Sequence, residues 1–169
     1  MKSEAADPAR RLDRAFLAAA PAHWIALSGG AGLVPKAPGT IGALVGLPLG
    51  FGLAAAGPLA ALALVVLLGL IGVWACGATA RAAGVHDHQA IVFDETWAMA
   101  AVVAFGPQGL MAALVGFAAF RLFDIAKPWP IGWADDHVEG GLGIMLDDGL
   151  AALYALAGLH ILARFGWLA

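Results

Sequence analysis

The sequence predicts an all-α fold: a small multi-helix membrane bundle with its polar loops gathered on one face. Hydrophobic residues make up 62% of the 169 residues and charged residues only 12%, whereas soluble domains are about half apolar and about a quarter charged. The mean hydropathy of +0.85 agrees with this assignment. The apolar segments also come in pairs joined by Gly-Pro, which marks a turn between helices. A densely packed soluble helix bundle is the less favoured interpretation.

Five apolar segments are expected to be helical. The first two flank Gly57-Pro58, the next two flank Gly106-Pro107, and the last stands alone near the C-terminus. Only the second has the roughly 20 residues of an ordinary membrane-spanning helix. We therefore expect four to five helices, some of them short, tilted or re-entrant. The segments are 41–56, 59–78, 90–105 (or 96–105), 110–120 and 149–165.

The longer connecting segments carry most of the charge. They cover residues 23–40, 79–95 and 121–146, and nine of the twelve acidic residues lie between Asp87 and Asp148. If each hairpin enters and leaves the membrane on one side, these loops share a face and the uncharged Gly-Pro turns lie opposite. Basic residues favour the cytoplasmic side, so we expect the loops at the cytoplasmic surface of a multi-pass protein.

The chain is expected to form one domain. Residues 1–21 mix both charge signs without a clean signal-peptide profile, which predicts a surface or disordered segment. Residues 22–169 then form a single helical membrane domain. The one cysteine, Cys76, excludes an intrachain disulfide. No basic run or basic-aromatic stripe is present, so no nucleic-acid partner is expected.

Two pairs of adjacent carboxylates stand before apolar segments: Asp94 with Glu95, and Asp147 with Asp148. Each pair alone is explained by the preference of acidic residues for a helix N-terminus. If both pairs of carboxylates lie at the same depth in the membrane, they would repel each other strongly unless a cation is bound between them. Oxygen ligands suit a hard ion, so all four residues are predicted to hold Mg²⁺, with Mn²⁺ as the alternative. A membrane ion-binding or transport protein is the competing class, although acids in the middles of the segments would be expected there.

Basic residues follow in "FRLFDIAKPWP". Arg121 and Asp124 are neighbours at i and i+3 on a helix, and a simple surface ion pair would explain them. The functional interpretation has Arg121 and Lys127 facing a phosphate, because guanidinium matches phosphate oxygens and lysine supplies a point charge. Asp124 would orient the arginine or join the metal site. The nearby Asp135 and Asp136 are interpreted as a solvated loop.

Two further groups carry weaker signals. His86 and His88 are either surface histidines or groups that transfer protons near the phosphate. The glycine-rich stretch 28–43 contains Lys36 and Thr40, and backbone N–H groups at a helix start can bind phosphate. No Walker A spacing is present, so this signal alone is weak.

Four blocks of the sequence, in this order, resemble the motifs of the phosphatidylglycerophosphatase A family. The resemblance covers about residues 22–164, with Ala43 where serine is common. It implies a Mg²⁺-dependent lipid phosphatase of the bacterial inner (cytoplasmic) membrane, with its active site facing the cytoplasm. The substrate would be phosphatidylglycerophosphate, and the products phosphatidylglycerol and phosphate for phospholipid biosynthesis. The blocks are "APGTIGAL", "GVHDHQAIVFDE", "FRLFDIAKPWPIGWAD" and "GGLGIMLDD".

Two mechanisms fit these residues. In the first, the metal site activates water, Arg121 and Lys127 neutralise the phosphate, and His86 or His88 moves protons. In the second, Asp124 or another carboxylate such as Asp94 forms an aspartyl-phosphate. The D-x-x-D-G-x-x-A-R pattern of CDP-alcohol phosphotransferases is absent. Oligomeric state and acyl-chain preference are left open.

Overall fold

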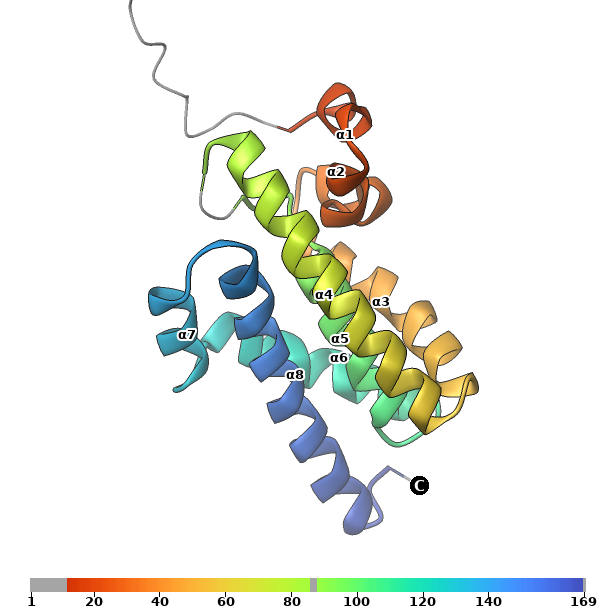
Figure 1. Cartoon of the computed structure of the whole chain (residues 1–169). Coiled ribbons are helices and arrows are strands. Elements are labelled where there is room, and N and C mark those ends of the chain that lie inside the picture. The colour runs from red at the N-terminus through yellow and green to blue at the C-terminus, as the bar shows by residue number, and fades with distance from the viewer. Residues whose placement is uncertain (1–11, 86–87, 169) are drawn as a thin grey trace, which may run out of the picture.

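The computed structural model describes residues 12–85 and 88–168, and within them the chain is helical and contains no strand (Figure 1). The all-α prediction is confirmed. The elements are α1 (Arg14–Ala19), α2 (Pro21–Ala26), the 3-10 helix η1 (Ser28–Leu33), α3 (Pro38–Ala55), α4 (Pro58–Ala83), α5 (Phe93–Phe105), α6 (Leu110–Ala126), α7 (Ile131–His137) and α8 (Gly140–Arg164).

Three helices, α3, α4 and α8, are long and apolar enough to cross a membrane. The outer surface of α4 suits such a setting, because large apolar side chains such as Leu59 and Leu70 are exposed there. In water this surface would be unfavourable, whereas lipid tails would cover it. The prediction of a helical membrane bundle is confirmed by these helices.

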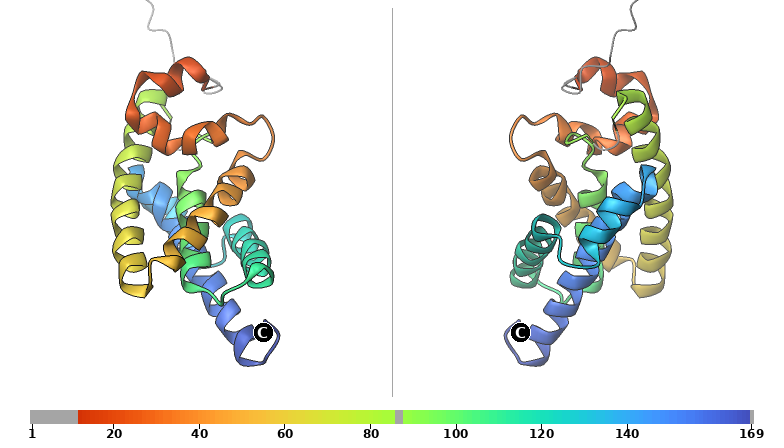
Figure 2. Two further views of the ribbon diagram at one scale, coloured as in Figure 1. Left: turned by 90° about the vertical axis from the view of Figure 1, so that its right-hand side faces the viewer. Right: turned by 90° about the vertical axis from the view of Figure 1, so that its left-hand side faces the viewer.

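Helix α5 lies at the centre of the bundle and contacts α3, α4, α6 and α8 (Figures 1 and 2). The closest approach is to α3, where Gly42, Gly46 and Gly50 recur at every fourth position. A Cβ atom at Gly46 would lie 2.5 Å from the Thr96 carbonyl oxygen, and one at Gly50 would lie 2.5 Å from the Val103 Cβ. Small residues at this spacing allow two helix backbones to pack closely.

The predicted hairpins are present. Gly57, with φ of 86°, separates α3 from α4, and Gly106 caps the end of α5 before the turn into α6. The starts of α3 and α5 and the end of α6, which carry the polar residues, therefore lie toward one side of the molecule. The Gly-Pro turns lie toward the other side (Figure 2).

The expected loop 121–146 is mostly helical, which corrects the prediction. Helix α6 continues to Ala126, and α8 begins at Gly140, so Asp147 and Asp148 lie about two turns inside α8 rather than at its start. Two glycines near the start of α8 are packing sites. A Cβ atom at Gly141 would lie 1.9 Å from the Val73 carbonyl oxygen on α4, and one at Gly143 would lie 1.8 Å from the Val138 carbonyl oxygen.

The N-terminal segment is described from Leu12 onward, and residues 1–11 lie outside the described residues. Asp13 caps α1 by accepting a hydrogen bond from the Phe16 N–H at 2.8 Å. Leu12 and Leu17 are buried in one core cluster with residues of α2 and α4. The division of the chain at residue 21 remains a prediction.

Candidate functional site

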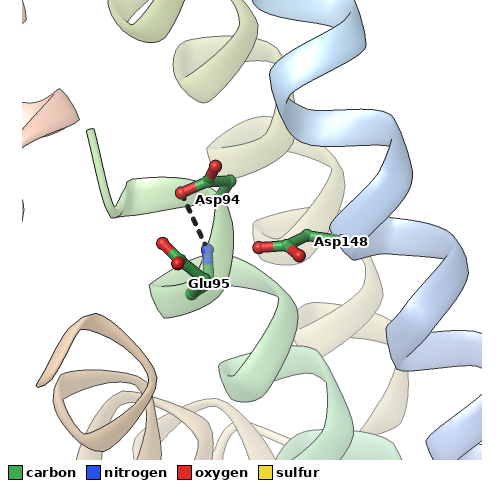
Figure 3. A group of neighbouring side chains, drawn as sticks. All are labelled: Asp94, Glu95 and Asp148. Carbon is green, nitrogen blue, oxygen red and sulfur yellow. Dashed lines mark hydrogen bonds between the residues drawn. The ribbon is translucent and has the colours of Figure 1, made fainter. Parts of the chain in front are cut away.

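Three carboxylates from two helices meet inside the bundle (Figure 3). Asp94 and Glu95 lie in the first turn of α5, and Asp148 faces them from α8. One carboxylate oxygen from each residue lies within 4.8 Å of the others. Asp148 is only 3% exposed. The Glu95 backbone N–H donates to Asp94 Oδ1 at 3.0 Å, which fixes the Asp94 side chain at the start of the helix.

The polar atoms of this cluster fit a bound cation. Glu95 Oε2 and Asp148 Oδ2 are buried and have no hydrogen-bond partner among the described residues. Burial raises the pKa of Asp94 well above its ordinary range, and the neighbouring Glu95 and Asp148 raise it further. Burial also raises the pKa of Glu95. Buried carboxylates without partners are costly, so a divalent cation bound by these oxygens would stabilise the ionised cluster.

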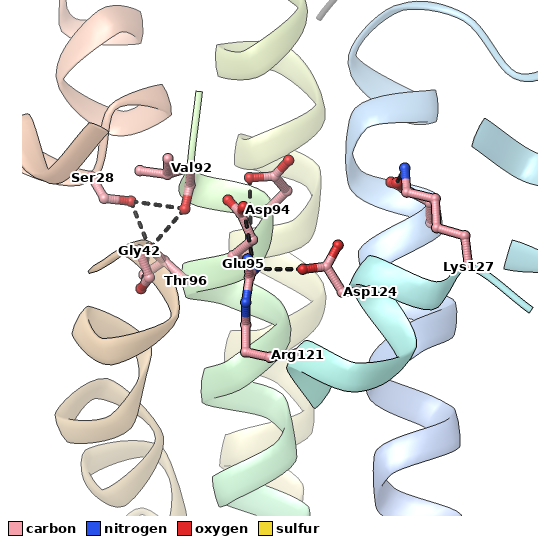
Figure 4. A network of polar contacts seen from close by, with 10 residues as sticks. Ser28, Gly42, Val92, Asp94, Glu95, Thr96, Arg121, Asp124 and Lys127 are labelled. Atoms are coloured by element: carbon pink, nitrogen blue, oxygen red, sulfur yellow. Dashed lines mark hydrogen bonds and ion pairs between the residues drawn. The ribbon is translucent and has the colours of Figure 1, made fainter. Parts of the chain in front are cut away.

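Arg121 and Asp124, both on α6, lie beside the cluster (Figure 4). The Arg121 Nη1 atom forms an ion pair with the Asp124 carboxylate and lies 3.5 Å from Glu95 Oε1. Its Nε atom is buried and has no hydrogen-bond partner among the described residues. The guanidinium therefore keeps its Nε–H donor for a ligand, and its planar fork suits phosphate oxygens.

Lys127 ends α6 in a left-handed conformation, with φ of 42°. Its Nζ atom lies 2.8 Å from Asp147 Oδ2 and 2.8 Å from Asp135 Oδ1. Burial alone would lower the pKa of Lys127, but the two carboxylates raise it above its ordinary value. Asp147, predicted as a metal ligand, pairs with Lys127 and is not one of the three clustered carboxylates.

The N-terminal end of α3 faces the carboxylate cluster and Arg121. Ala37 precedes the helix with φ of 48°, and no side chain caps the first backbone N–H groups. A Cβ atom at Gly39 would lie only 1.9 Å from Glu95 Oε1, so a glycine is required for this approach. The positive end of an 18-residue helix therefore lies against the carboxylates and can bind an anion.

These groups line one pocket of about 240 Å³. It brings together Asp94, Asp124, Arg121, Lys127, Glu95, Asp147 and Asp148, all predicted site residues. Gln89 and Ile91 also line it; both lie in the block "GVHDHQAIVFDE", but neither had been predicted as a site residue. The described residues that line it are Ala37, Pro38, Gly39, Gln89, Ile91, Asp94, Glu95, Arg121, Asp124, Lys127, Asp147 and Asp148.

Three predicted residues within the described part of the chain are not among this lining, and a fourth lies outside that part. Lys36 is exposed and Thr40 is half-buried, both near the start of α3. His88 lines an adjoining smaller hollow, and its Nδ1 atom accepts a hydrogen bond from the Ala90 N–H at 3.1 Å. His86 lies outside the described residues. The roles predicted for these four residues stay predictions.

A hydroxyl network supports the first turn of α5 (Figure 4). The Thr96 hydroxyl contacts the carbonyl oxygens of Gly42 and Val92 at 2.8 and 2.9 Å, and the Ser28 hydroxyl at 2.8 Å. It ties α5 to both α3 and η1, one residue after Glu95. The sequence does not indicate this network, because isolated hydroxyl residues form no motif.

Fold and site together define a helical membrane protein whose acidic pocket is flanked by an arginine, a lysine and a helix N-terminus. A family model described as Phosphatidylglycerophosphatase A matches residues 24–163. A protein of that name from Escherichia coli K12 is 41% identical over 146 residues, which covers 85% of this chain and 84% of the relative. The chain belongs to the phosphatidylglycerophosphatase A family, which confirms the resemblance.

Two other relatives are similar. A Phosphatidylglycerophosphatase A from Haemophilus influenzae is 44% identical over 141 residues, covering 80% of this chain and 85% of the relative. A protein from Bacteroides thetaiotaomicron, provisionally named a phosphatidylinositol-3-phosphatase, is 35% identical over 134 residues, covering 75% of this chain and 83% of the relative. No solved structure matches the chain.

Proposed function

We propose that this protein hydrolyses the terminal phosphomonoester of phosphatidylglycerophosphate, giving phosphatidylglycerol and phosphate for phospholipid biosynthesis. Membership of the phosphatidylglycerophosphatase A family supports a phosphatase. The observation that carries the proposal is the convergence of Arg121, Lys127 and three clustered carboxylates on one pocket. We place the protein in the bacterial inner membrane with this pocket facing the cytoplasm, following the positions of the basic residues.

Asp94, Glu95 and Asp148 would hold the divalent cation, with Mg²⁺ as the first choice and Mn²⁺ as the alternative. The support is the all-oxygen donor set and the two buried oxygens that have no protein partner. A bound Mg²⁺ would neutralise charge on the phosphoryl oxygens and polarise them.

The phosphate is bound by the cationic groups around the cluster. Arg121 offers its Nε–H, Lys127 offers one ammonium N–H, and the start of α3 offers backbone N–H groups. Phosphate monoesters hydrolyse extremely slowly without a catalyst. Donors placed where negative charge develops in the transition state supply much of the acceleration. Asp124 pairs with Arg121 and so holds the guanidinium in place.

Two routes for the displacement remain distinct. In the first, water attacks phosphorus, and a carboxylate that lines the pocket accepts the proton. In the second, Asp94 attacks first and a phosphoenzyme forms, which water then hydrolyses. Trapping with substrate labelled in its terminal phosphate separates them, because only the second route transfers the labelled phosphoryl group to a carboxylate of the enzyme. His86 and His88 are proposed to relay protons to solvent.

The test of function is phosphate release from phosphatidylglycerophosphate in detergent micelles. Wild type and Asp148→Asn are compared, each with Mg²⁺ and with EDTA, and phosphatidylinositol 3-phosphate is the competing substrate. We expect release that requires the metal, prefers phosphatidylglycerophosphate and is lost in the folded variant. No release by folded wild type would refute the proposed function and return attention to ion transport.

A further inference from the structure

The ammonium group of Lys127 is held by carboxylates from two different helices. Asp147 belongs to α8, and Asp135 belongs to the seven-residue helix α7; each carboxylate oxygen lies 2.8 Å from Nζ. A lysine ammonium has three N–H donors. Two of them serve these carboxylates, and the third is left for a ligand in the pocket that Lys127 lines.

Helix α7 is packed so that Asp135 reaches this position. Ile131 and Ala134 are buried, with exposures of 0% and 1%, and they hold one side of α7 against the bundle. Gly132 approaches the backbone of Lys127 so closely that a Cβ atom there would lie 2.9 Å from the lysine carbonyl oxygen. The adjacent Asp136 is exposed and forms no ion pair with any described residue.

The backbone of Lys127 is itself unusual. Its φ of 42° lies in the left-handed region of backbone conformations, which residues other than glycine rarely adopt. Such conformations persist where the surroundings hold them, and they cluster at functional sites. Here the conformation ends α6, and the lysine ammonium contacts Asp135 on α7 and Asp147 on α8.

We propose that Asp135 is a positioning residue that, together with Asp147, holds the Lys127 ammonium with its third N–H toward the phosphate. This inference depends on the proposed function in one respect, namely that the ligand in the pocket is a phosphate group. Without Asp135 the ammonium keeps one carboxylate partner and its long side chain gains rotational freedom. Phosphate binding then weakens, while the chemistry at the carboxylate cluster continues.

The first test measures the amine reactivity of Lys127 and needs no catalysis. The chain has three lysines, Lys2, Lys36 and Lys127, so mass spectrometry after limited acetylation can report each one, with exposed Lys36 as the internal standard. An ammonium held by two carboxylates keeps its proton and reacts slowly. We expect Asp135→Asn to raise the Lys127 labelling relative to Lys36 by about three- to tenfold. The matched control Asp136→Asn removes the same charge one residue away and should leave the ratio unchanged. Equal ratios in the two variants would overturn the proposal.

The second test is kinetic and uses the full-length protein in micelles. Asp135→Asn should raise KM and the inhibition constant of inorganic phosphate by about three- to tenfold, with kcat changed by less than about twofold. Asp135→Glu should recover part of the loss, because it restores the carboxylate. An unchanged KM in Asp135→Asn, or an equal rise in Asp136→Asn, would contradict the positioning role. Wild type without activity would refute the proposed function, and the labelling ratio would still decide the role of Asp135.

Discussion

Gly39→Ala places the smallest possible side chain at the closest contact between α3 and the carboxylate cluster. Gly39 lies in the first turn of α3 and is buried. The added Cβ would lie 1.9 Å from Glu95 Oε1, 2.9 Å from Glu95 Cδ and 3.4 Å from Arg121 Nη1. The Glu95 carboxylate therefore has to move away from its present position, or the start of α3 has to lift.

The size of the effect follows from the overlap. Real Cβ atoms essentially never approach another heavy atom within 3.0 Å, so the contact has to open by about 1 Å. A misplacement of about 1 Å at a reacting centre costs about 10²-fold in rate, and we expect this loss in kcat/KM, equivalent to about 2.7 kcal/mol. Folding should survive, because the atom that must move is the end of a flexible side chain and alanine favours helix by up to about 1 kcal/mol over glycine.

The assay is phosphate release from phosphatidylglycerophosphate, together with the melting temperature of each variant. Gly52→Ala is the matched control, because Gly52 lies in the same helix and a Cβ there meets nothing within 4 Å. It should keep wild-type activity. Wild-type activity in a folded Gly39→Ala variant would refute the assignment of Glu95 and the start of α3 to the site.

Three further predictions test other parts of the account. Arg121→Lys keeps the charge but loses the planar fork, so kcat/KM for phosphate release should fall by about 10²-fold or more; a loss below about threefold would contradict the role of Arg121. Thr96→Val removes a hydroxyl that bonds two carbonyls and Ser28, and chemical denaturation should show a loss of about 1–3 kcal/mol. His23 is buried against Thr79, and burial lowers the pKa of His23 below its ordinary value of 6.5. Its contribution to stability is present above about pH 6.5 and is lost as pH falls toward the folded-state pKa, because the unfolded chain then binds the proton first. Between about pH 7.5 and about pH 5.5, the melting temperature of His23→Gln should therefore fall less than that of wild type. Equal falls in the two proteins would contradict a lowered pKa of His23 in the folded state.

Hydrophobic runs and Gly-Pro pairs were enough to predict the hairpins. The bounds of α8 were not predicted, because Gly141 and Gly143 look like loop residues in sequence and become close-packing sites only beside Val73 and Val138. The sequence around a glycine does not reveal which distant segment of the backbone will pack against it.

The pair Asp147-Asp148 shows a second limit of sequence reasoning. At the start of a helix, two adjacent carboxylates were expected to share one ion. Inside α8, successive side chains point about 100° apart because the helix has 3.6 residues per turn. Asp148 therefore faces Asp94 and Glu95, while Asp147 faces Lys127. The ion pair between Asp135 and Lys127 was missed for a related reason, since only the packing of α7 brings Asp135 to the lysine.

The central claim is that Asp94, Glu95 and Asp148 form the metal site. Binding of Mn²⁺ to the purified protein in micelles, followed by the paramagnetic resonance signal of the free ion, tests it most directly. The paired variants Asp148→Asn and Asp147→Asn remove the same charge from neighbouring positions. We predict that Asp148→Asn weakens Mn²⁺ binding by at least about tenfold, while Asp147→Asn changes it by less than about threefold. Equal losses in both variants, or unchanged binding in Asp148→Asn, would contradict the account.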